Sequence, residues 1–189
     1  ARVYVLAVVA VGALLSAYSV LTLRIVQPAP FVWLLLLAVV ASIFKIAVPM
    51  PASSQPLNLS LAFAPNFAAL LVLDGPAAML VAVVAAWTQT TFNTLRTRNP
   101  WHRTVFNMAA LAVTMTATEL ALRSVSGHGR PWGVRADAPA LGAAVITYYL
   151  VNSGVVAGAI AAASQQSFFG LWRKHLLSGW LGHIFGAVA

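Results

Sequence analysis

Residues 140–163 read ALGAAVITYYLVNSGVVAGAIAAA, a run that contains no Asp, Glu, Lys or Arg. A helix needs about 20 mainly apolar residues to cross the hydrocarbon core of a bilayer. This run meets that length, and it has no polar face of the kind that a helix on the surface of a soluble protein carries. We therefore predict that Ala140–Ala163 is a transmembrane helix.

The composition of the whole chain agrees with this prediction. Hydrophobic residues make up 61% of the 189 residues, and charged residues only 7%. A soluble domain carries about 25% charged residues, so an ordinary soluble enzyme is excluded. The length favours one domain. We expect residues 1–189 to form a single transmembrane domain, cut from a parent chain that continues into a further helix and a cytoplasmic domain.

Six more apolar runs are separated by turn signals or by basic loops. The expected fold is an all-α, polytopic membrane helix bundle with about seven transmembrane helices in this chain and eight in the parent. The sequence Asp74-Gly75-Pro76 predicts a tight turn between the third and fourth runs. The predicted spans are Val3–Val26, Phe31–Val48, Leu59–Leu73, Ala77–Thr94, Thr104–Leu122, Ala140–Ala163 and the shorter Leu176–Ala189.

The distribution of basic residues predicts the orientation. Lys and Arg concentrate in the cytoplasmic loops of membrane proteins, and more of the eleven fall on the inner side when the N-terminus is cytoplasmic. We therefore expect the N-terminus on the cytoplasmic side of the membrane. This orientation depends on Leu59–Leu73 crossing the membrane, although Pro65 and Asn66 interrupt it. A re-entrant segment there would move the basic loop Arg96–Arg103 outside.

The net charge of +8 would suggest nucleic acid in a soluble chain. Here the charges lie in short clusters between apolar runs, so we expect contacts with membrane lipids and no nucleic-acid partner. The chain has no cysteine, which excludes disulfides and thiol catalysis.

Catalysis and metal binding are not expected. The four histidines are scattered, although His183 could ligate a single pigment or haem. The three acidic residues form no pair for acid–base chemistry. We predict no metal, no cofactor and no enzymatic activity for this chain.

Small residues indicate where helices approach closely. Two GxxxG pairs lie in the sixth and seventh predicted spans, and Gly12 and Ser16 form a weaker version in the first. Such pairs serve either packing within a bundle or a dimer seam, and both alternatives stay open here. The predicted packing glycines are Gly154, Gly158, Gly182 and Gly186.

Polar side chains within a span are costly and are candidates for function. Asn107 and Asn152 lie inside their predicted helices beside aromatic residues. Each amide can either join two helices or bind a polar ligand. Glu119 either pairs with Arg123, one turn later, or faces a cavity as a ligand-binding carboxylate. The candidate ligand-binding residues are Asn66, Gln89, Asn93, Asn107, Glu119 and Asn152.

Four short motifs carry a family resemblance. They are LNLSLAF at 57–63, RTVFN at 103–107, YYLVNSG at 148–154 and LWRKH at 171–175. The chain resembles the multi-helix N-terminal membrane regions of bacterial signalling proteins with cytoplasmic GGDEF or HD-GYP output domains, which make or degrade cyclic di-GMP. Those regions are similar in turn to vitamin-uptake proteins, including substrate-binding components of energy-coupling transporters. The resemblance implies a location in a bacterial inner membrane and recurring polar positions at Asn107 and Asn152, and it names no ligand.

The expected function is therefore that of a non-catalytic membrane sensor or anchor domain. It would bind an unknown small molecule or lipid in a polar bundle interior, with two helix packings of different affinity for that ligand. One alternative is a small-solute transporter or its substrate-binding subunit. Another is an accessory subunit of a large membrane complex. Membrane lipids, a second copy of the chain or a larger membrane complex are the expected partners.

Overall fold

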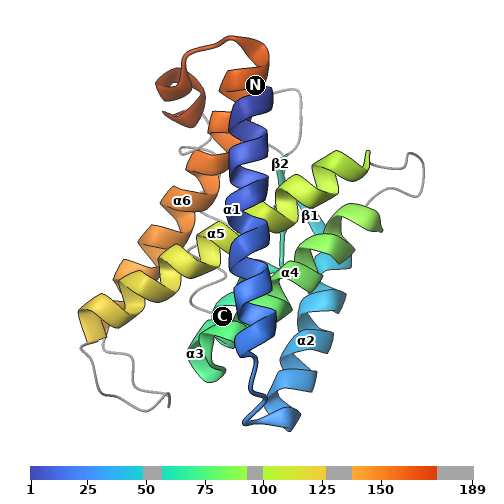
Figure 1. The fold of residues 1–189 in the computed structure, drawn as a ribbon, viewed down its shortest axis with the longest axis vertical. Helices are drawn as coiled ribbons and strands as arrows, with labels where there is room; N and C mark the ends of the chain where they lie inside the picture. Colours follow the sequence, from blue (N-terminus) through green and yellow to red (C-terminus); the bar gives the residue numbers. More distant parts are fainter. Residues whose placement is uncertain (49–56, 93–99, 127–137, 174–189) are drawn as a thin grey trace.

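A computed structural model of the chain describes residues 1–48, 57–92, 100–126 and 138–173. These residues form six helices and one β-hairpin (Figure 1), followed by a short helical stretch at 168–173. The elements are α1 (Arg2–Thr22), α2 (Pro28–Ile43), β1 (Lys45–Val48), β2 (Leu57–Ser60), α3 (Phe63–Val72), α4 (Gly75–Thr91), α5 (Trp101–Ser126) and α6 (Ala138–Ser164).

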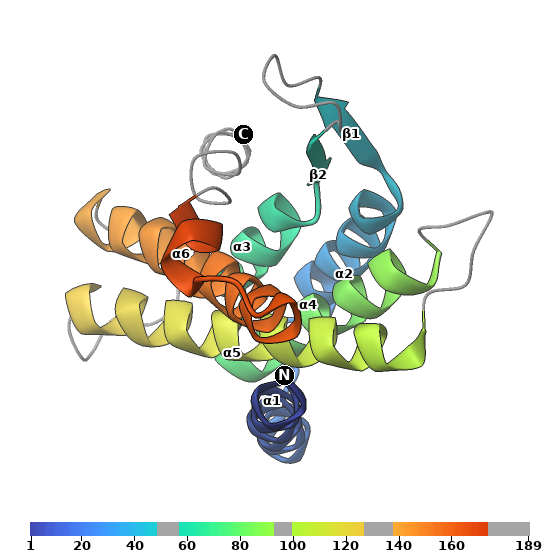
Figure 2. The ribbon, with the colours of Figure 1, turned by 90° about the horizontal axis from the view of Figure 1, so that it is seen from above.

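Helix α4 forms the centre of the bundle and contacts α1, α2, α3 and α5. Its residues 75–87 carry no polar side chain, and Ala78, Ala82 and Ala85 have no exposed surface. Such small side chains let neighbouring helix backbones approach closely. By contrast, α1 stands on the outer side of α5 (Figure 2) and exposes large apolar side chains such as Leu14 and Leu21. A core of small residues with an apolar outer surface is typical of a membrane bundle.

Three helices, α1, α5 and α6, are long and apolar enough to cross a membrane. They match the first, fifth and sixth predicted spans and support a membrane protein in general. Helices α2, α3 and α4 have only 16, 10 and 17 residues, below the about 20 that a span usually needs. Seven full spans are therefore not confirmed. The predicted seventh span, Leu176–Ala189, lies outside the described residues.

The third predicted span, Leu59–Leu73, is a strand followed by a short helix. The 10 residues of α3 rise about 15 Å, half of a hydrocarbon core of about 30 Å. Pro65 limits the helix on its N-terminal side, because its ring clashes with the carbonyl of the residue four positions earlier. Figure 1 shows the chain rising through α2 and β1 and returning through β2 and α3. The predicted N-terminal orientation depended on a full span here, and it stays a prediction.

The β-hairpin is the one departure from the all-α prediction in the part of the chain that the structure describes. Strand β1 pairs antiparallel with β2, with Lys45 opposite Ser60. The predicted second span, Phe31–Val48, therefore ends as a helix at Ile43. Two physical reasons favour the extended chain: β-branched residues prefer strands, and Pro49 disfavours a helical conformation in the residue before it.

Local signals set the ends of the helices. The Asp74 side chain caps α4 by accepting a hydrogen bond from the Ala77 N–H at 3.0 Å, and Pro76 occupies the first turn. The predicted turn at this point is therefore confirmed. Helix α6 is followed by Gln165 at φ +57°, a left-handed conformation that commonly ends helices.

Candidate functional site

Asn66 is the buried polar side chain that the fold leaves incompletely bonded. It lies in the first half of α3, and only 1% of the residue is exposed. Its backbone N–H donates to the carbonyl of Ala62 at 3.2 Å. Its side-chain Oδ1 has no hydrogen-bond partner among the residues that the structure describes. Because buried polar atoms are almost always hydrogen-bonded, Asn66 marks the candidate site.

The other end of the Asn66 amide reaches α6. A side-chain hydrogen bond joins Asn66 to Tyr148, which is itself buried, with 3% exposed. Since Oδ1 has no partner, the donor is the Asn66 Nδ2–H and the acceptor is the Tyr148 hydroxyl oxygen. This bond connects the half-length helix α3 to the long helix α6.

Aromatic rings surround this hydrogen bond. The ring of Phe63 meets that of Tyr148 edge to face at a centroid distance of 4.7 Å, and it stacks on Phe67 at 5.5 Å. Phe63 and Phe67 are one helical turn apart, so α3 presents both to the same side. On α6, the buried residues Ala140, Ala144 and Tyr148 recur every four positions, which turns the tyrosine inward.

This arrangement can bind a hydrogen-bond donor. A buried carbonyl without a partner costs about 1–3 kcal/mol, which a ligand N–H or O–H would recover. The amide, the phenol and the two phenyl rings carry no charge, so the site favours an uncharged ligand. We refer to Asn66, Tyr148, Phe63 and Phe67 as the α3–α6 site.

The other candidate amides are not gathered at this site. Asn107 is exposed on the surface of α5, whereas Gln89 on α4 and Asn152 on α6 are half-buried. Asn152 lies one turn beyond Tyr148 on the same face of α6. Asn93 lies outside the described residues. Among the candidate amides that the structure describes, only Asn66 is fully buried.

The Glu119 carboxylate contacts both Arg123 and the start of α4. It forms an ion pair with Arg123, and 16% of the Glu119 side chain and 54% of the Arg123 side chain are exposed. The carboxylate also lies directly against Gly75, the first residue of α4. A negative charge is favourable at a helix N-terminus. The geometry therefore fits the ion-pair alternative, in which Glu119 joins α5 to the start of α4.

The glycine pair of α6 packs against aromatic side chains of the same chain. A methyl group at Gly158 would overlap the phenol of Tyr4 from α1, and a Cβ at Gly154 would lie 3.8 Å from Trp172 Nε1. This geometry favours packing within the bundle over a dimer seam at Gly158. Gly182 and Gly186 lie outside the described residues.

No group of three or more His, Asp or Glu side chains that could hold a metal ion is found in the described residues. Sequence reasoning did not single out Tyr148, Tyr4 or Trp172. One available signal was that Tyr148 stands four positions before Asn152 on the helix, so the two share a face. For Tyr4 and Trp172 we find no signal in the sequence that predicts their partners.

Comparisons with family models, with curated proteins and with solved structures find no match. The family resemblance carried by the four short motifs therefore stays a prediction.

Proposed function

We propose that this chain is the membrane sensor domain of a bacterial signalling protein and that it binds a small uncharged molecule at the α3–α6 site. The observation that carries the proposal is the buried Asn66 Oδ1, which lacks a hydrogen-bond partner in the described structure. In small-molecule sites a few polar groups among aromatic and apolar side chains fix the orientation of a ligand, and here the Asn66 amide lies beside Tyr148, which packs on Phe63.

The proposed mechanism uses the junction between the short helix and the long one. Helix α3 contacts α2 and α4, and its bond to Tyr148 also links it to α6. A ligand that donates to Asn66 Oδ1 would bind better to one packing of α3 on α6 than to another. That difference in affinity is the only means by which a ligand shifts a conformational equilibrium. Helix α6 leads on to the C-terminal part of the chain, where an output domain would follow.

Transport is the second candidate, and the shape of α3 favours it. Solute transporters often build their sites from discontinuous helices near the middle of the membrane. Here a strand and a 10-residue helix replace a full span. Uptake of a labelled solute into vesicles, lost in Asn66→Leu and kept in Asn107→Leu, would support transport over sensing.

The intact mass of the chain in its native membrane separates the two candidates. The sensor proposal predicts a mass far above the 19.9 kDa of these residues, because an output domain must be attached. A native mass close to 19.9 kDa would contradict the single-chain sensor and favour a transporter subunit.

A further inference from the structure

The chain turns back on itself after α6. Gln165 adopts a left-handed conformation, with φ +57°, and residues 168–173 are again helical. The indole Nε1–H of Trp172 then donates to the Ser153 hydroxyl oxygen at 3.0 Å. Ser153 lies about three turns before the end of α6. The returning segment is therefore held along the side of α6.

This segment exposes a group of aromatic rings next to a guanidinium. Phe168 stacks on Trp172 at 5.7 Å and meets Phe169 edge to face at 5.4 Å. Phe169 is 73% exposed, and Arg173 is exposed as well. Exposed Phe side chains are unfavourable in water, whereas aromatic rings are enriched where a membrane meets water.

A tyrosine from the first helix reaches the same level of α6. The Tyr4 hydroxyl donates to the carbonyl of Val155 at 3.1 Å, and its ring covers Gly158. Trp172 binds α6 at Ser153, less than one turn from Val155. Arg2, two residues before Tyr4, is exposed. We call Tyr4, Phe168, Phe169 and Trp172, with the flanking Arg2 and Arg173, the aromatic collar.

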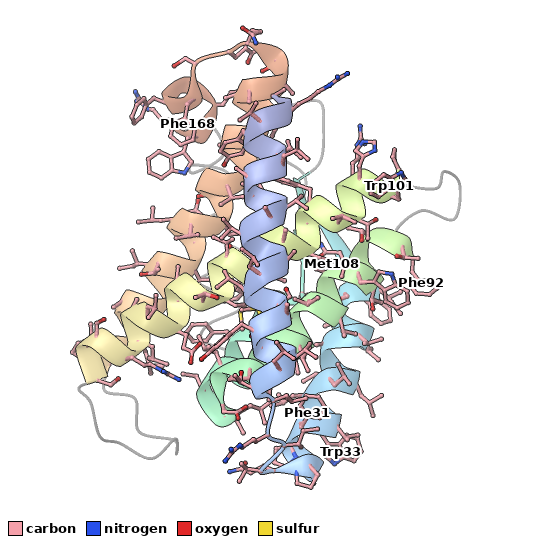
Figure 3. The ribbon with its side chains drawn as sticks, viewed as in Figure 1. Phe31, Trp33, Phe92, Trp101, Met108 and Phe168 are labelled. Carbon is pink, nitrogen blue, oxygen red and sulfur yellow. The ribbon has the colours of Figure 1, made fainter. Side chains whose placement is uncertain are left out.

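The length of α6 allows the collar to lie at the edge of the hydrocarbon core. The 27 residues of α6 extend about 40 Å, roughly 10 Å more than the core. If α6 enters the core at Ala138, it leaves the core about 20 residues later. That point is close to Gly158, the residue that Tyr4 covers. Figure 3 shows Phe168 beside this end of α6, with Phe31 and Trp33 at the opposite end of the molecule, as in the two aromatic belts of a membrane protein.

The charges of the aromatic collar indicate which lipids it binds. Both of its charged residues are arginines. The two described acidic residues, Asp74 and Glu119, lie instead at the start of α4, where Glu119 touches Gly75. Guanidinium groups bind phosphate through several hydrogen bonds. We infer that the aromatic collar is an interfacial anchor that binds the phosphate of anionic phospholipids.

The test uses the fluorescence of Trp172 in the full chain, with the other tryptophans replaced by Phe, reconstituted in lipid vesicles. Phosphatidylcholine with bromine near the headgroup should quench Trp172 more strongly than phosphatidylcholine with bromine near the chain end. Brominated phosphatidylglycerol should quench at lower mole fractions than brominated phosphatidylcholine. Stronger quenching by the deep bromines, or equal quenching by the two headgroups, would overturn the inference.

Arginine variants test the charge contribution. Arg173→Gln should lower the relative affinity for phosphatidylglycerol about fivefold, which corresponds to ~1 kcal/mol for one basic side chain near an anionic surface. Arg24→Gln is the matched control, because Arg24 is also exposed but follows the other end of α1, and it should leave quenching of Trp172 unchanged. Added inorganic phosphate should not compete. Loss of the lipid preference at millimolar phosphate would mean that the collar binds free phosphate and not a membrane.

A second measurement does not depend on the multiple tryptophan replacements. The chain has no cysteine, so Phe169→Cys provides a single attachment point for a spin label at an exposed position. The accessibility of the label to oxygen and to a water-soluble nickel complex should match that of a label in the headgroup region. Full accessibility to the nickel complex would show that the segment lies in water and would contradict the inference.

Discussion

Tyr4 of α1 lies directly over Gly158 of α6, and its hydroxyl donates to the Val155 carbonyl at 3.1 Å. The first helix and the last complete helix of the described structure are thus joined by one phenol. Only a glycine leaves room for the ring at this point. The contact closes the bundle between residues that are 151 positions apart in sequence.

Gly158→Ala should destabilise the protein by about 1 kcal/mol, the typical contribution of one hydrogen bond, because the new methyl group displaces the Tyr4 hydroxyl. This change is measured by unfolding the protein in mild-detergent micelles with increasing amounts of dodecyl sulfate. Gly142→Ala is the control on the same helix: nothing lies within 4 Å of its added Cβ, so we expect no loss. In the Tyr4→Phe background, the Gly158→Ala change should cost less. Equal costs in both backgrounds would contradict the assignment.

Gly12→Ala should be more damaging than Gly158→Ala. Its Cβ would overlap the Cα of Ala109 on α5, and backbone atoms cannot turn away as a tyrosine ring can. Overpacking of this kind costs about 1–3 kcal/mol. The same titration measures it, and a Gly12→Ala protein as stable as wild type would show that α1 and α5 do not cross at this point.

Gln165→Gly should stabilise the chain. A side chain in the left-handed conformation costs about 1–2 kcal/mol, which glycine avoids, although glycine also gives the unfolded chain more freedom. We therefore expect a net gain of up to about 1 kcal/mol. Gln165→Val should have the opposite sign, since a β-branched residue tolerates positive φ poorly. Resistance to unfolding by dodecyl sulfate should therefore decrease from Gln165→Gly to wild type to Gln165→Val.

The sequence predicted the long helices well and the short elements poorly. Helices α1, α5 and α6 follow from uninterrupted apolar runs. The segment around Pro65 was predicted as a full span, because hydropathy cannot distinguish a helix from a strand joined to a short helix. A polar residue inside a run also does not reveal which way it faces: Asn66 is buried, whereas Asn107 is exposed. That difference is set by tertiary packing between helices.

The same limit applies to the packing glycines. The spacing of Gly154 and Gly158 predicted close contacts, but not that aromatic side chains of this chain make them. Tyr4 lies on α1, far from α6 in the sequence, and Trp172 lies beyond the C-terminal end of α6. A single sequence contains no information on such pairings.

Tyr148→Phe and Asn66→Leu should affect stability differently. Tyr148→Phe removes the acceptor for the Asn66 N–H and leaves a second buried polar group without its partner, at a cost of about 1–3 kcal/mol. Asn66→Leu removes the unpaired carbonyl together with the donor, and we expect a change within about 1 kcal/mol of zero. Equal, large losses for both variants would show that the Asn66 carbonyl is already satisfied in the native protein.

Native mass spectrometry of the chain, purified from its own membrane in mild detergent, tests the proposed α3–α6 site most directly. The wild-type protein should retain a small molecule that Asn66→Leu loses. Asn107→Leu, the same change at an exposed amide, should retain that molecule. A molecule that stays bound in Asn66→Leu, or no bound molecule in the wild type, would contradict a ligand site at Asn66 and Tyr148.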